Sequence, residues 1–284
     1  MNNNAATLAF LGPEGTFSHQ AARFLLNSSQ PVSYTLKAYP SIPHILYAVE
    51  KGEVAYGLVP VENSIEGSVN VTMDVLADKQ LIYIHEEIVL DIKHYLYSQM
   101  TSLEQIHTIM SHPQAIAQCR HFLEEKLNHA AIIATESTAE AVRQLDKGNG
   151  GYAAIGSRDN NDLYNVPVLC SDIGDYTHNQ TRFLLVSKTP GTSQITHKTS
   201  LILTLEKDRP GGLYDILGEF AGQNINLTRI ESRPVKKELG SYLFFLDCEA
   251  GHNHPGLQAV INNLIAKKSL LKNLGSYPVF HNAD

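Results

Sequence analysis

Short polar side chains recur at five turns, each placed between a predicted strand end and a predicted helix start. The turns are Gly15-Thr16-Phe17-Ser18, Glu62-Asn63-Ser64, Ser111-His112-Pro113-Gln114, Ser137-Thr138 and Gly156-Ser157. In an open α/β sheet such turns line the crevice at the carboxyl ends of the strands, where helix N-termini present free N–H groups. A crevice of this kind suits a carboxylate. A serine or threonine in any single turn more often only caps a helix, but five turns together favour a binding site.

A second candidate group, Thr181-Arg182-Phe183, ends a polar loop and opens an apolar run that continues to Val186. The planar fork of an arginine matches a carboxylate, and a neighbouring hydroxyl can donate a hydrogen bond. From spacing alone, however, the pattern favours the start of an edge strand with a surface arginine.

Several common kinds of catalytic site are excluded. The turn Gly12-x-x-Gly15-Thr16 lacks the lysine and the glycine spacing of a phosphate-binding loop. Neither a Gly-x-Ser-x-Gly elbow nor a His-Glu-x-x-His pair occurs. His252 and His254 lie close together beside a turn, but without a nearby cysteine they are more typical of a solvated loop than of a metal site. We therefore expect no cofactor and no metal.

Charge and cysteine usage limit the partners and the location. The chain of 284 residues carries 22 Lys plus Arg against 29 Asp plus Glu, a net charge of -7 that offers no bulk attraction to nucleic acid or to an anionic membrane. The N-terminal residues predict no secretory signal, and we expect no membrane span because no stretch approaches the roughly 18 apolar residues that cross a bilayer. Cys119, Cys170 and Cys248 are far apart and odd in number, which is typical of a reducing compartment. We expect a small-molecule partner and a cytoplasmic location.

Up to about Lys188 the chain alternates short apolar runs with helix-period segments, which predicts an α/β fold. Strands are expected at 7–11, 56–61, 108–111, 131–134 and 152–155, and Ser41 is expected to cap a helix. The segment 87–97 alternates apolar and polar residues and is predicted as one long strand crossing between two lobes. We place the first lobe at about 1–90 and 179–190 and the second at about 91–178.

A linker of small polar residues, 189–194, follows the first domain of 1–190 and precedes a second domain at 198–278. There, strands are expected at 200–205, 225–233, 241–249 and 271–277, with a helix after the turn at 208–212 and another over 257–265. This is the βαββαβ order of a ferredoxin-like α+β fold. Its middle strands are apolar on both faces, whereas two helices cover only one. We therefore expect a homo-oligomer, dimer or tetramer, in which a partner subunit covers the other face or its edge.

Several motifs, taken in order, resemble the signatures of prephenate dehydratases. They are Gly12-Pro13-Glu14-Gly15-Thr16-Phe17-Ser18, Val59-Pro60-Val61-Glu62-Asn63-Ser64, Ser111-His112-Pro113-Gln114-Ala115 and Asn179-Gln180-Thr181-Arg182-Phe183. Gly211-Gly212-Leu213 and Glu231-Ser232-Arg233-Pro234 resemble the signatures of the C-terminal ACT regulatory domain of that family. Gly212 departs from the pattern, which usually has alanine there. The resemblance covers nearly the whole chain and implies a two-lobed catalytic domain like a periplasmic binding protein.

The resemblance implies a carbon–oxygen lyase that converts prephenate to phenylpyruvate, water and carbon dioxide in L-phenylalanine biosynthesis. Thr181 is then expected to hydrogen-bond the departing hydroxyl, and Arg182 to hold the pyruvyl carboxylate, because a salt bridge to the ring carboxylate would stabilise the ground state. The proton source is left open between Glu62, His112 and water. The expected substrate-binding residues are Thr16, Ser18, Glu62, Asn63, Ser64, His112, Gln114 and Phe183.

Feedback inhibition by L-phenylalanine is the regulation that the resemblance implies. The expected effector site comprises Gly211, Gly212, Leu213, Asn226, Leu227, Glu231, Ser232, Arg233 and Pro234. Glycines at a helix N-terminus let main-chain N–H groups approach the ligand carboxylate, and the leucines could contact a phenyl ring.

Two other functions stay open at this point. Arogenate dehydratase performs the same chemistry on an amino-acid analogue and would need an acceptor for the substrate ammonium, which Glu62 could supply. A non-catalytic amino-acid sensor would also use two lobes around a cleft, although Thr181-Arg182-Phe183 argues against it.

Overall fold

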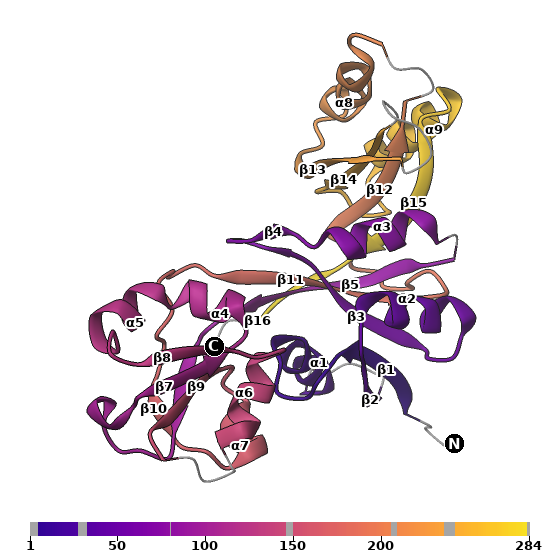
Figure 1. The fold of residues 1–284 in the computed structure, drawn as a ribbon. Coiled ribbons are helices and arrows are strands. Elements are labelled where there is room, and N and C mark those ends of the chain that lie inside the picture. Colours follow the sequence, from indigo (N-terminus) through magenta and orange to yellow (C-terminus); the bar gives the residue numbers. More distant parts are fainter. Residues whose placement is uncertain are drawn as a thin grey trace.

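Three sheets organise the chain in the computed structural model, which describes residues 5–27, 33–79, 81–145, 150–205, 209–235 and 242–282. Figure 1 shows two lobes side by side, with a C-terminal domain standing on the first of them. Residues 146, 208 and 241, at which expected elements end or begin, lie outside the described residues. The two-lobed α/β catalytic fold and the ferredoxin-like domain are as predicted.

Lobe one is a mixed sheet covered by helices on both faces. Its strand order is β16-β5-β11-β3-β1-β2, with the short β4 (Gly67–Ser68) paired to β3. The other strands are β1 (Ala6–Leu11), β2 (Tyr34–Tyr39), β3 (Tyr56–Asn63), β5 (Tyr83–Asp91), β11 (Gln180–Ser187) and β16 (Val279–Asn282). Helix α1 (Phe17–Asn27) covers one face, while α2 (Ile42–Lys51) and α3 (Asn70–Asp78) cover the other.

Local sequence explains where α2 begins and ends. Ser41 is the N-cap, and its hydroxyl accepts a hydrogen bond from the main-chain N–H of His44, as predicted. Pro43 lies in the first turn, and Gly52 ends the helix in the left-handed conformation at φ 74°.

Lobe two is a five-stranded sheet in the order β10-β6-β9-β7-β8. These strands are β6 (Tyr95–Ser98), β7 (Thr108–Ser111), β8 (Ala131–Ala134), β9 (Tyr152–Gly156) and β10 (Val168–Cys170). Its helices are α4 (Pro113–Gln118), α5 (Arg120–Lys126), α6 (Thr138–Leu145) and α7 (Asn160–Tyr164), with a 3-10 turn, η1, at Leu103–Gln105. The parallel β7, β8 and β9 direct their carboxyl ends to one edge, toward lobe one.

The connection between the lobes differs from the prediction. The single long strand expected at 87–97 is two strands, because β5 ends at Asp91 and β6 begins at Tyr95 in a different sheet. Between them, the N–H of Ile92 donates to the carbonyl of Asn179 at 2.8 Å, and the N–H of Ile173 donates to the carbonyl of His94 at 2.9 Å. The outgoing and returning segments are therefore bonded to each other where they cross between the lobes.

The C-terminal domain has the order β13-β14-β12-β15, with every neighbouring pair antiparallel. Its elements are β12 (Lys198–Thr204), α8 (Gly212–Gly222), β13 (Leu227–Pro234), β14 (Tyr242–Cys248), α9 (Pro255–Ala266) and β15 (Leu270–Tyr277). Both helices pack on one face of the sheet, around Leu201, Leu246 and Leu257.

Lobe one covers the other face of the C-terminal sheet. Ile202, Phe245 and Tyr277 belong to the same buried cluster as Met73 and Leu76 of α3. The prediction that this face requires a partner subunit is therefore wrong, because the catalytic domain of the same chain already buries it. Figure 1 shows α3 between the two domains.

After β15 the chain returns to lobe one. Strand β16 pairs with β5 in parallel, from Val279 opposite Glu87 to Asn282 opposite Leu90. This strand is not among the predicted elements, because it lies beyond the predicted end of the second domain at 278. Both ends of the C-terminal domain are thus joined to the lobe-one sheet.

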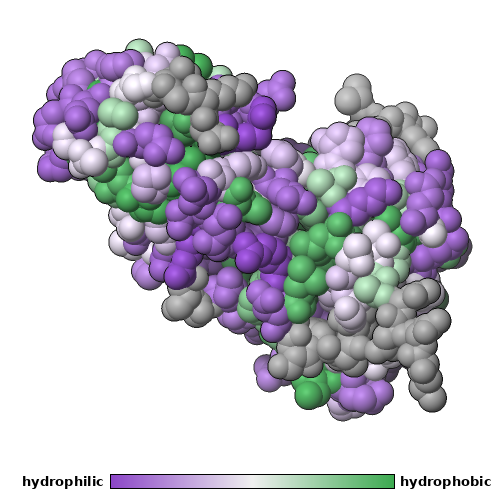
Figure 2. Space-filling model, turned by 90° about the horizontal axis from the view of Figure 1, so that it is seen from below, coloured by the Kyte–Doolittle hydropathy of each residue, from purple (hydrophilic) through white to green (hydrophobic). Residues whose placement is uncertain are grey.

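Seen from below, the surface is mainly hydrophilic with separate hydrophobic patches (Figure 2). Among the described residues, no helix is long and apolar enough to span a membrane.

Candidate active site

The cleft between the lobes collects strand ends and helix starts from both sheets. Its volume is about 250 Å³. The lining residues are Leu11, Gly12, Thr16, Phe17, Ser18, Asn63, Ile92, His94, His112, Gln114, Ala115, Gln118, Glu136, Ser137, Thr138 and Thr181. Six of the expected site residues are among them: Thr16, Ser18, Asn63, His112, Gln114 and Thr181.

Helix N-termini are the main electropositive groups of this cleft. The first residues of α1 and α6, Phe17 and Thr138, and the second residue of α4, Gln114, belong to the lining. Two of these starts are capped by side chains, since Ser137 Oγ accepts the N–H of Glu140 at 3.0 Å and His112 Nδ1 accepts that of Gln114 at 3.3 Å. No lysine or arginine appears among the described lining residues. An anionic ligand would therefore meet helix N-termini rather than a side-chain cation.

Gly15 brings the start of α1 into contact with lobe two. Its φ of 86° is in the left-handed region, and a Cβ there would lie 2.3 Å from Oδ1 of Asn160. Ser157 Oγ of lobe two also donates to the Gly15 carbonyl at 2.8 Å. The fifth polar turn of the sequence thus joins the lobes instead of lining the cleft, and only glycine fits at position 15.

The Thr181 hydroxyl is oriented by Asn63. Asn63 Nδ2 donates to Thr181 Oγ1 at 3.0 Å, and its Oδ1 accepts the main-chain N–H groups of Ile65 and Glu66, both at 3.0 Å. Because these two N–H groups fix the amide orientation, Thr181 must be the acceptor in its bond with Asn63. The hydrogen of the Thr181 hydroxyl is therefore free to donate to a ligand in the cleft.

A chain of amides continues behind this pair. Asn63 Nδ2 also donates to Asn179 Oδ1 at 2.8 Å, and Asn179 Nδ2 donates to Gln118 Oε1 at 2.9 Å. His94 Nε2 bonds to the same Gln118 oxygen at 2.9 Å. Residues of lobe one, lobe two and the crossover are therefore held in one hydrogen-bonded network.

His94 is uncharged near neutral pH. Burial lowers the pKa of its imidazole, and the bond to Gln118 and the charges of Asp172 and Asp175 oppose this only partly. Its ring and that of Phe17 make a T-shaped contact with the centroids 5.4 Å apart.

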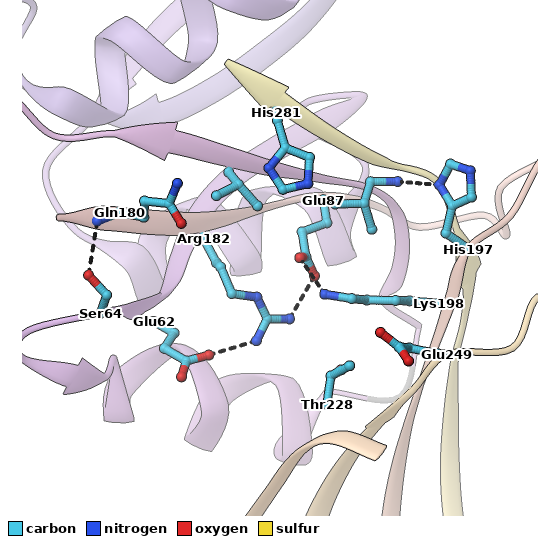
Figure 3. A pocket seen from close by; sticks show the side chains of 12 residues that line it. Glu62, Ser64, Glu87, Gln180, Arg182, His197, Lys198, Thr228, Glu249 and His281 are labelled. Atoms are coloured by element: carbon cyan, nitrogen blue, oxygen red, sulfur yellow. Dashed lines mark hydrogen bonds and ion pairs between the residues drawn. The ribbon is translucent and has the colours of Figure 1, made fainter. Parts of the chain in front are cut away.

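Arg182 does not lie in the cleft. It lines a second pocket of about 720 Å³ between lobe one and the C-terminal domain, together with Glu62, Ser64, Lys198 and His281. Figure 3 shows this junction pocket, with the Arg182 guanidinium pointing toward Glu62 and Glu87.

Three carboxylates form ion pairs with the guanidinium of Arg182. They belong to Glu62, Glu87 and Asp247, at 2.6, 2.6 and 2.7 Å. Burial works against the charge, but Asp247 and Glu87 outweigh it and raise the pKa of Arg182 above its usual value. Lys198 adds a further ion pair to Glu87 at 2.8 Å. Arg182 therefore lies outside the cleft in which it was expected to hold the pyruvyl carboxylate.

Alternation along two strands explains this correction. Thr181 and Asn63 are cross-strand partners in β11 and β3 and both face the cleft. Side chains that follow or precede them point to the opposite face, which places Arg182, Glu62 and Ser64 at the junction pocket. Glu62 and Ser64, which were expected to contact the substrate, therefore also lie outside the cleft.

Phe183 points back toward the α1 side, but it lies beneath the cleft. It is 1% exposed and packs in the lobe-one core with Phe10 and Leu58. Phe183 therefore shapes the strand that carries Thr181 instead of contacting the substrate ring.

Two of the expected effector-site residues contact lobe one instead. Arg233 forms an ion pair with Asp74 at 2.7 Å and donates to Asn70 at 2.7 Å, both in α3. Glu231 accepts hydrogen bonds from Ser68 of β4 and from Arg229. The side chains of Glu231 and Arg233 thus hold the two domains together, and they are not available to a ligand in this arrangement.

The remaining effector-site residues lie at the margin of the C-terminal core. Gly211 caps α8 at φ 81°, and Leu213 and Leu227 pack partly against the same hydrophobic cluster. Asn226 Nδ2 donates to Glu249 at 2.8 Å. Ser232 and Pro234 are exposed on β13.

Sequence reasoning missed four polar residues of the site: His94, Gln118, Glu136 and Asn179. Gln118 follows Gln114 by one helical turn, a spacing that could have placed both on one face of α4. The alternation of apolar and polar residues over 87–97 is interrupted near His94, and this interruption was the other signal in the sequence for a residue of the site. Among the described residues, no group of three His, Cys, Asp or Glu side chains could hold a metal ion.

Comparison with known proteins decides the family. The family model described as prephenate dehydratase matches residues 8–191, and the model described as ACT domain matches residues 199–265. The chain belongs to the prephenate dehydratase family. Members of this family are lyases that dehydrate and decarboxylate prephenate.

Relatives of the prephenate dehydratase family match nearly the whole chain. Prephenate dehydratase of Methanocaldococcus jannaschii is 40% identical over 271 residues, covering 94% of this chain and 96% of the relative. The crystal structure of prephenate dehydratase from Arthrobacter aurescens in complex with L-Phe has a TM-score of 0.86 at 33% identity, covering 96% and 90% of the two chains. A structure of GqqA, described as a novel type of quorum quenching acylase, has a TM-score of 0.83 at 25% identity, covering 96% and 98%. The fold alone therefore does not decide the reaction.

Proposed function

We propose that the cleft converts prephenate to phenylpyruvate with Thr181 as the hydrogen-bond donor to the departing hydroxyl. The observation that carries this proposal is the bond from Asn63 to Thr181 Oγ1 at 3.0 Å, which directs the remaining hydroxyl hydrogen into the cleft. A preorganised donor of this kind acts where negative charge develops on the leaving oxygen.

The absence of a cation from the described lining fits this reaction. Prephenate carries two carboxylates, and the ring carboxylate must give up its charge as it leaves as carbon dioxide. A strong salt bridge there would stabilise the substrate more than the transition state. The N-termini of α1, α4 and α6 bind the dianion through partial charges and main-chain N–H groups.

Aromatisation of the ring supplies the driving force, so the residues need only position the substrate and assist the leaving group. The carbon–oxygen bond breaks with its electrons going to oxygen, a proton joins that oxygen, and the carbon–carbon bond to carbon dioxide gives its electrons to the ring. The cleft offers Glu136, His112 and water as proton sources. Glu62 is no longer a candidate, because it pairs with Arg182 on the opposite face.

The test is the appearance of phenylpyruvate, followed by its ultraviolet absorbance, when purified protein is given prephenate. Parallel assays with arogenate decide between the two dehydratases. Glu136 takes the place of Glu62 as the carboxylate that an arogenate ammonium would need. No turnover of either substrate would leave the amino-acid sensor as the remaining interpretation.

We further propose that L-phenylalanine binds to the ACT domain and inhibits the enzyme. The support is the Arthrobacter relative in complex with L-Phe and the Gly211 turn beside Leu213 and Leu227. The Gly212 departure is mild, because a Cβ at this position would lie 3.3 Å from the flexible side chain of Leu205. Inhibition requires a coupling free energy of roughly 1 to 3 kcal/mol between the two sites.

A homo-oligomer is proposed through the edge of the C-terminal sheet, which is the second of the two expected surfaces, because the catalytic domain already covers the face. Strand β13 is the edge of its sheet. Ile230 of β13 and Tyr242 of the neighbouring β14 are 49% and 48% exposed. An exposed edge with apolar side chains is a template for pairing with a second copy. Light scattering on the full chain and on Ile230→Lys tests this, and a monomer for the unmodified chain at micromolar concentration would contradict it.

The three cysteines, all free, support the proposed cytoplasmic location.

A further inference from the structure

His94 has a ring nitrogen for which the described residues provide no partner. The residue sits in the crossover between the lobes, is 2% exposed and lines the cleft. Its Nδ1 is buried and makes no hydrogen bond to any described residue. A buried polar atom without a partner loses the hydrogen bond that water would give it, so such atoms are rare outside functional sites.

The neighbouring amides determine which nitrogen of His94 carries the hydrogen. Gln118 Nε2 faces the carboxylate of Glu66 at 3.2 Å, and a carboxylate only accepts. Gln118 Oε1 must therefore face Asn179 and His94, and it too can only accept. Nε2 of His94 is consequently the donor in the 2.9 Å bond to Gln118.

In the neutral ring, a hydrogen on Nε2 leaves Nδ1 as a pure acceptor. Phe17 makes a T-shaped contact with the ring, with the centroids 5.4 Å apart, and this contact helps to fix the ring plane. His94, which lines the cleft as Thr181 does, therefore carries at Nδ1 an oriented lone pair that is unpaired among the described residues.

We propose that Nδ1 of His94 accepts a hydrogen bond from the ring hydroxyl of the substrate. This inference rests on the proposed function of the cleft. The prephenate dianion has two carboxylates and a keto group, which only accept, so its ring hydroxyl is the one group that can donate. That hydroxyl receives a hydrogen bond from Thr181 at its oxygen and gives its own hydrogen to His94.

The contact assists the reaction without any transfer of the proton to His94. By accepting the hydroxyl hydrogen, Nδ1 fixes the rotation about the carbon–oxygen bond of the substrate. The oxygen lone pairs are then held toward Thr181 and the acid when that bond breaks, which is an orientation that favours reaction. His94 is thus assigned as a residue that recognises the leaving hydroxyl.

Two amide variants separate Nδ1 from Nε2. In His94→Gln the side-chain amide reaches the former Nε2 position and keeps a partner for Gln118, but nothing replaces Nδ1. In His94→Asn the amide occupies the former Nδ1 position and can still accept. We expect His94→Gln to lower kcat/KM for prephenate at least about tenfold, with most of the loss in kcat, and His94→Asn to recover a large part of it.

A measurement on the unmodified protein does not depend on whether the variants fold. Nitrogen-15 NMR of labelled histidine should show Nδ1 of His94 as the unprotonated nitrogen. Its resonance should move when 4-hydroxyphenylpyruvate binds, and it should move much less with phenylpyruvate, which lacks the ring hydroxyl. A protonated Nδ1, or equal shifts with both ligands, overturns the proposal.

The kinetic result is equally decisive. Unchanged kcat/KM in His94→Gln, or equal losses in the two variants at similar unfolding midpoints, would show that the acceptor at Nδ1 is not used. Failure of the proposed function is a separate outcome, since the unmodified protein would then not turn over prephenate at all.

Discussion

Thr181 and Arg182 are consecutive residues of β11 whose side chains serve opposite faces of the lobe-one sheet. The hydroxyl of Thr181 lines the cleft, and the guanidinium of Arg182 is bound to Asp247 of the C-terminal domain at 2.7 Å. Glu87 holds the same guanidinium at 2.6 Å and receives Lys198 of the C-terminal domain at 2.8 Å. A shift of that domain relative to lobe one therefore acts on the residue next to Thr181.

Thr181→Ala is expected to lower kcat at least about a hundredfold, an amount typical of one transition-state donor. The fold should persist, because the side chain is only partly buried. Steady-state kinetics with prephenate measure the effect, and Thr181→Ser is the matched control that keeps the hydroxyl. Near-normal turnover by Thr181→Ala would remove Thr181 from the mechanism.

Arg182→Lys is expected to reduce stability and leave substrate binding nearly unchanged. Lysine cannot reproduce three simultaneous contacts, and breaking buried ion pairs costs on the order of 3 kcal/mol. Denaturant unfolding should show the loss, while KM for prephenate stays within about twofold because Arg182 lies outside the cleft.

Arg120→Lys is the control for that experiment, since Arg120 pairs with the exposed Glu124 and such pairs contribute little. A large rise in KM for Arg182→Lys at unchanged stability would return Arg182 to the substrate site.

Asp247→Asn breaks the same junction from the other domain and should weaken inhibition by L-phenylalanine if the coupling passes through β11.

Removal of the C-terminal domain after Lys188 is expected to destabilise the catalytic domain. Truncation exposes apolar side chains of lobe one, such as Met73, Leu76 and Ile84, that share a core with Phe245 and Tyr277. The unfolding midpoint should fall by at least about 5 °C. Thermal unfolding of both forms checks this, and equal midpoints would show that the two domains are independent. Point variants at the effector site are therefore better tests of L-phenylalanine regulation than truncation.

Lys272 is expected to make stability depend on alkaline pH. Its ammonium donates to the carbonyls of Leu76 and Lys79, and burial, partly opposed by Glu50, lowers its pKa to about 8. The unfolded chain, with a lysine pKa of about 10.4, binds this proton more tightly than the folded protein. The Lys272 contribution to stability therefore rises between about pH 8 and pH 10.

The measurement is urea unfolding of the unmodified chain and of Lys272→Met across that range. Subtracting the variant removes the other groups that titrate there. A difference that is constant or falls with pH would contradict the lowered pKa.

The sequence predicted the two folds well because their signals are local. Apolar periods, the cap at Ser41 and the βαββαβ order each depend on residues close together in the chain. Thr181 and Asn63 were also found from their motifs. The face of the sheet to which Arg182 points could not be read from its motif, because alternation becomes informative only once the direction of one neighbour is known.

The contacts between the two domains were also not predicted from the sequence. Apolar residues on both faces of β14 showed that both faces would be buried, but not by what. The covering surface of α3 is more than a hundred residues away in the sequence, and nothing local to either segment identifies the partner. For the same reason His94 remained unnoticed, since its network joins residues from three separate segments.

The return of the chain through β16 determines how the C-terminal domain can move. The domain leaves lobe one after β11 and comes back to β5, so two covalent connections, not one, join it to the same sheet. A domain on one connection can swing in any direction, whereas two anchoring points restrict it to rotation about the line between them. The only strand that separates the two anchoring strands, β11 and β16, is β5, which carries Glu87. Rotation about such an axis would directly stretch or compress the ion pairs that Glu87 forms with Arg182 and Lys198.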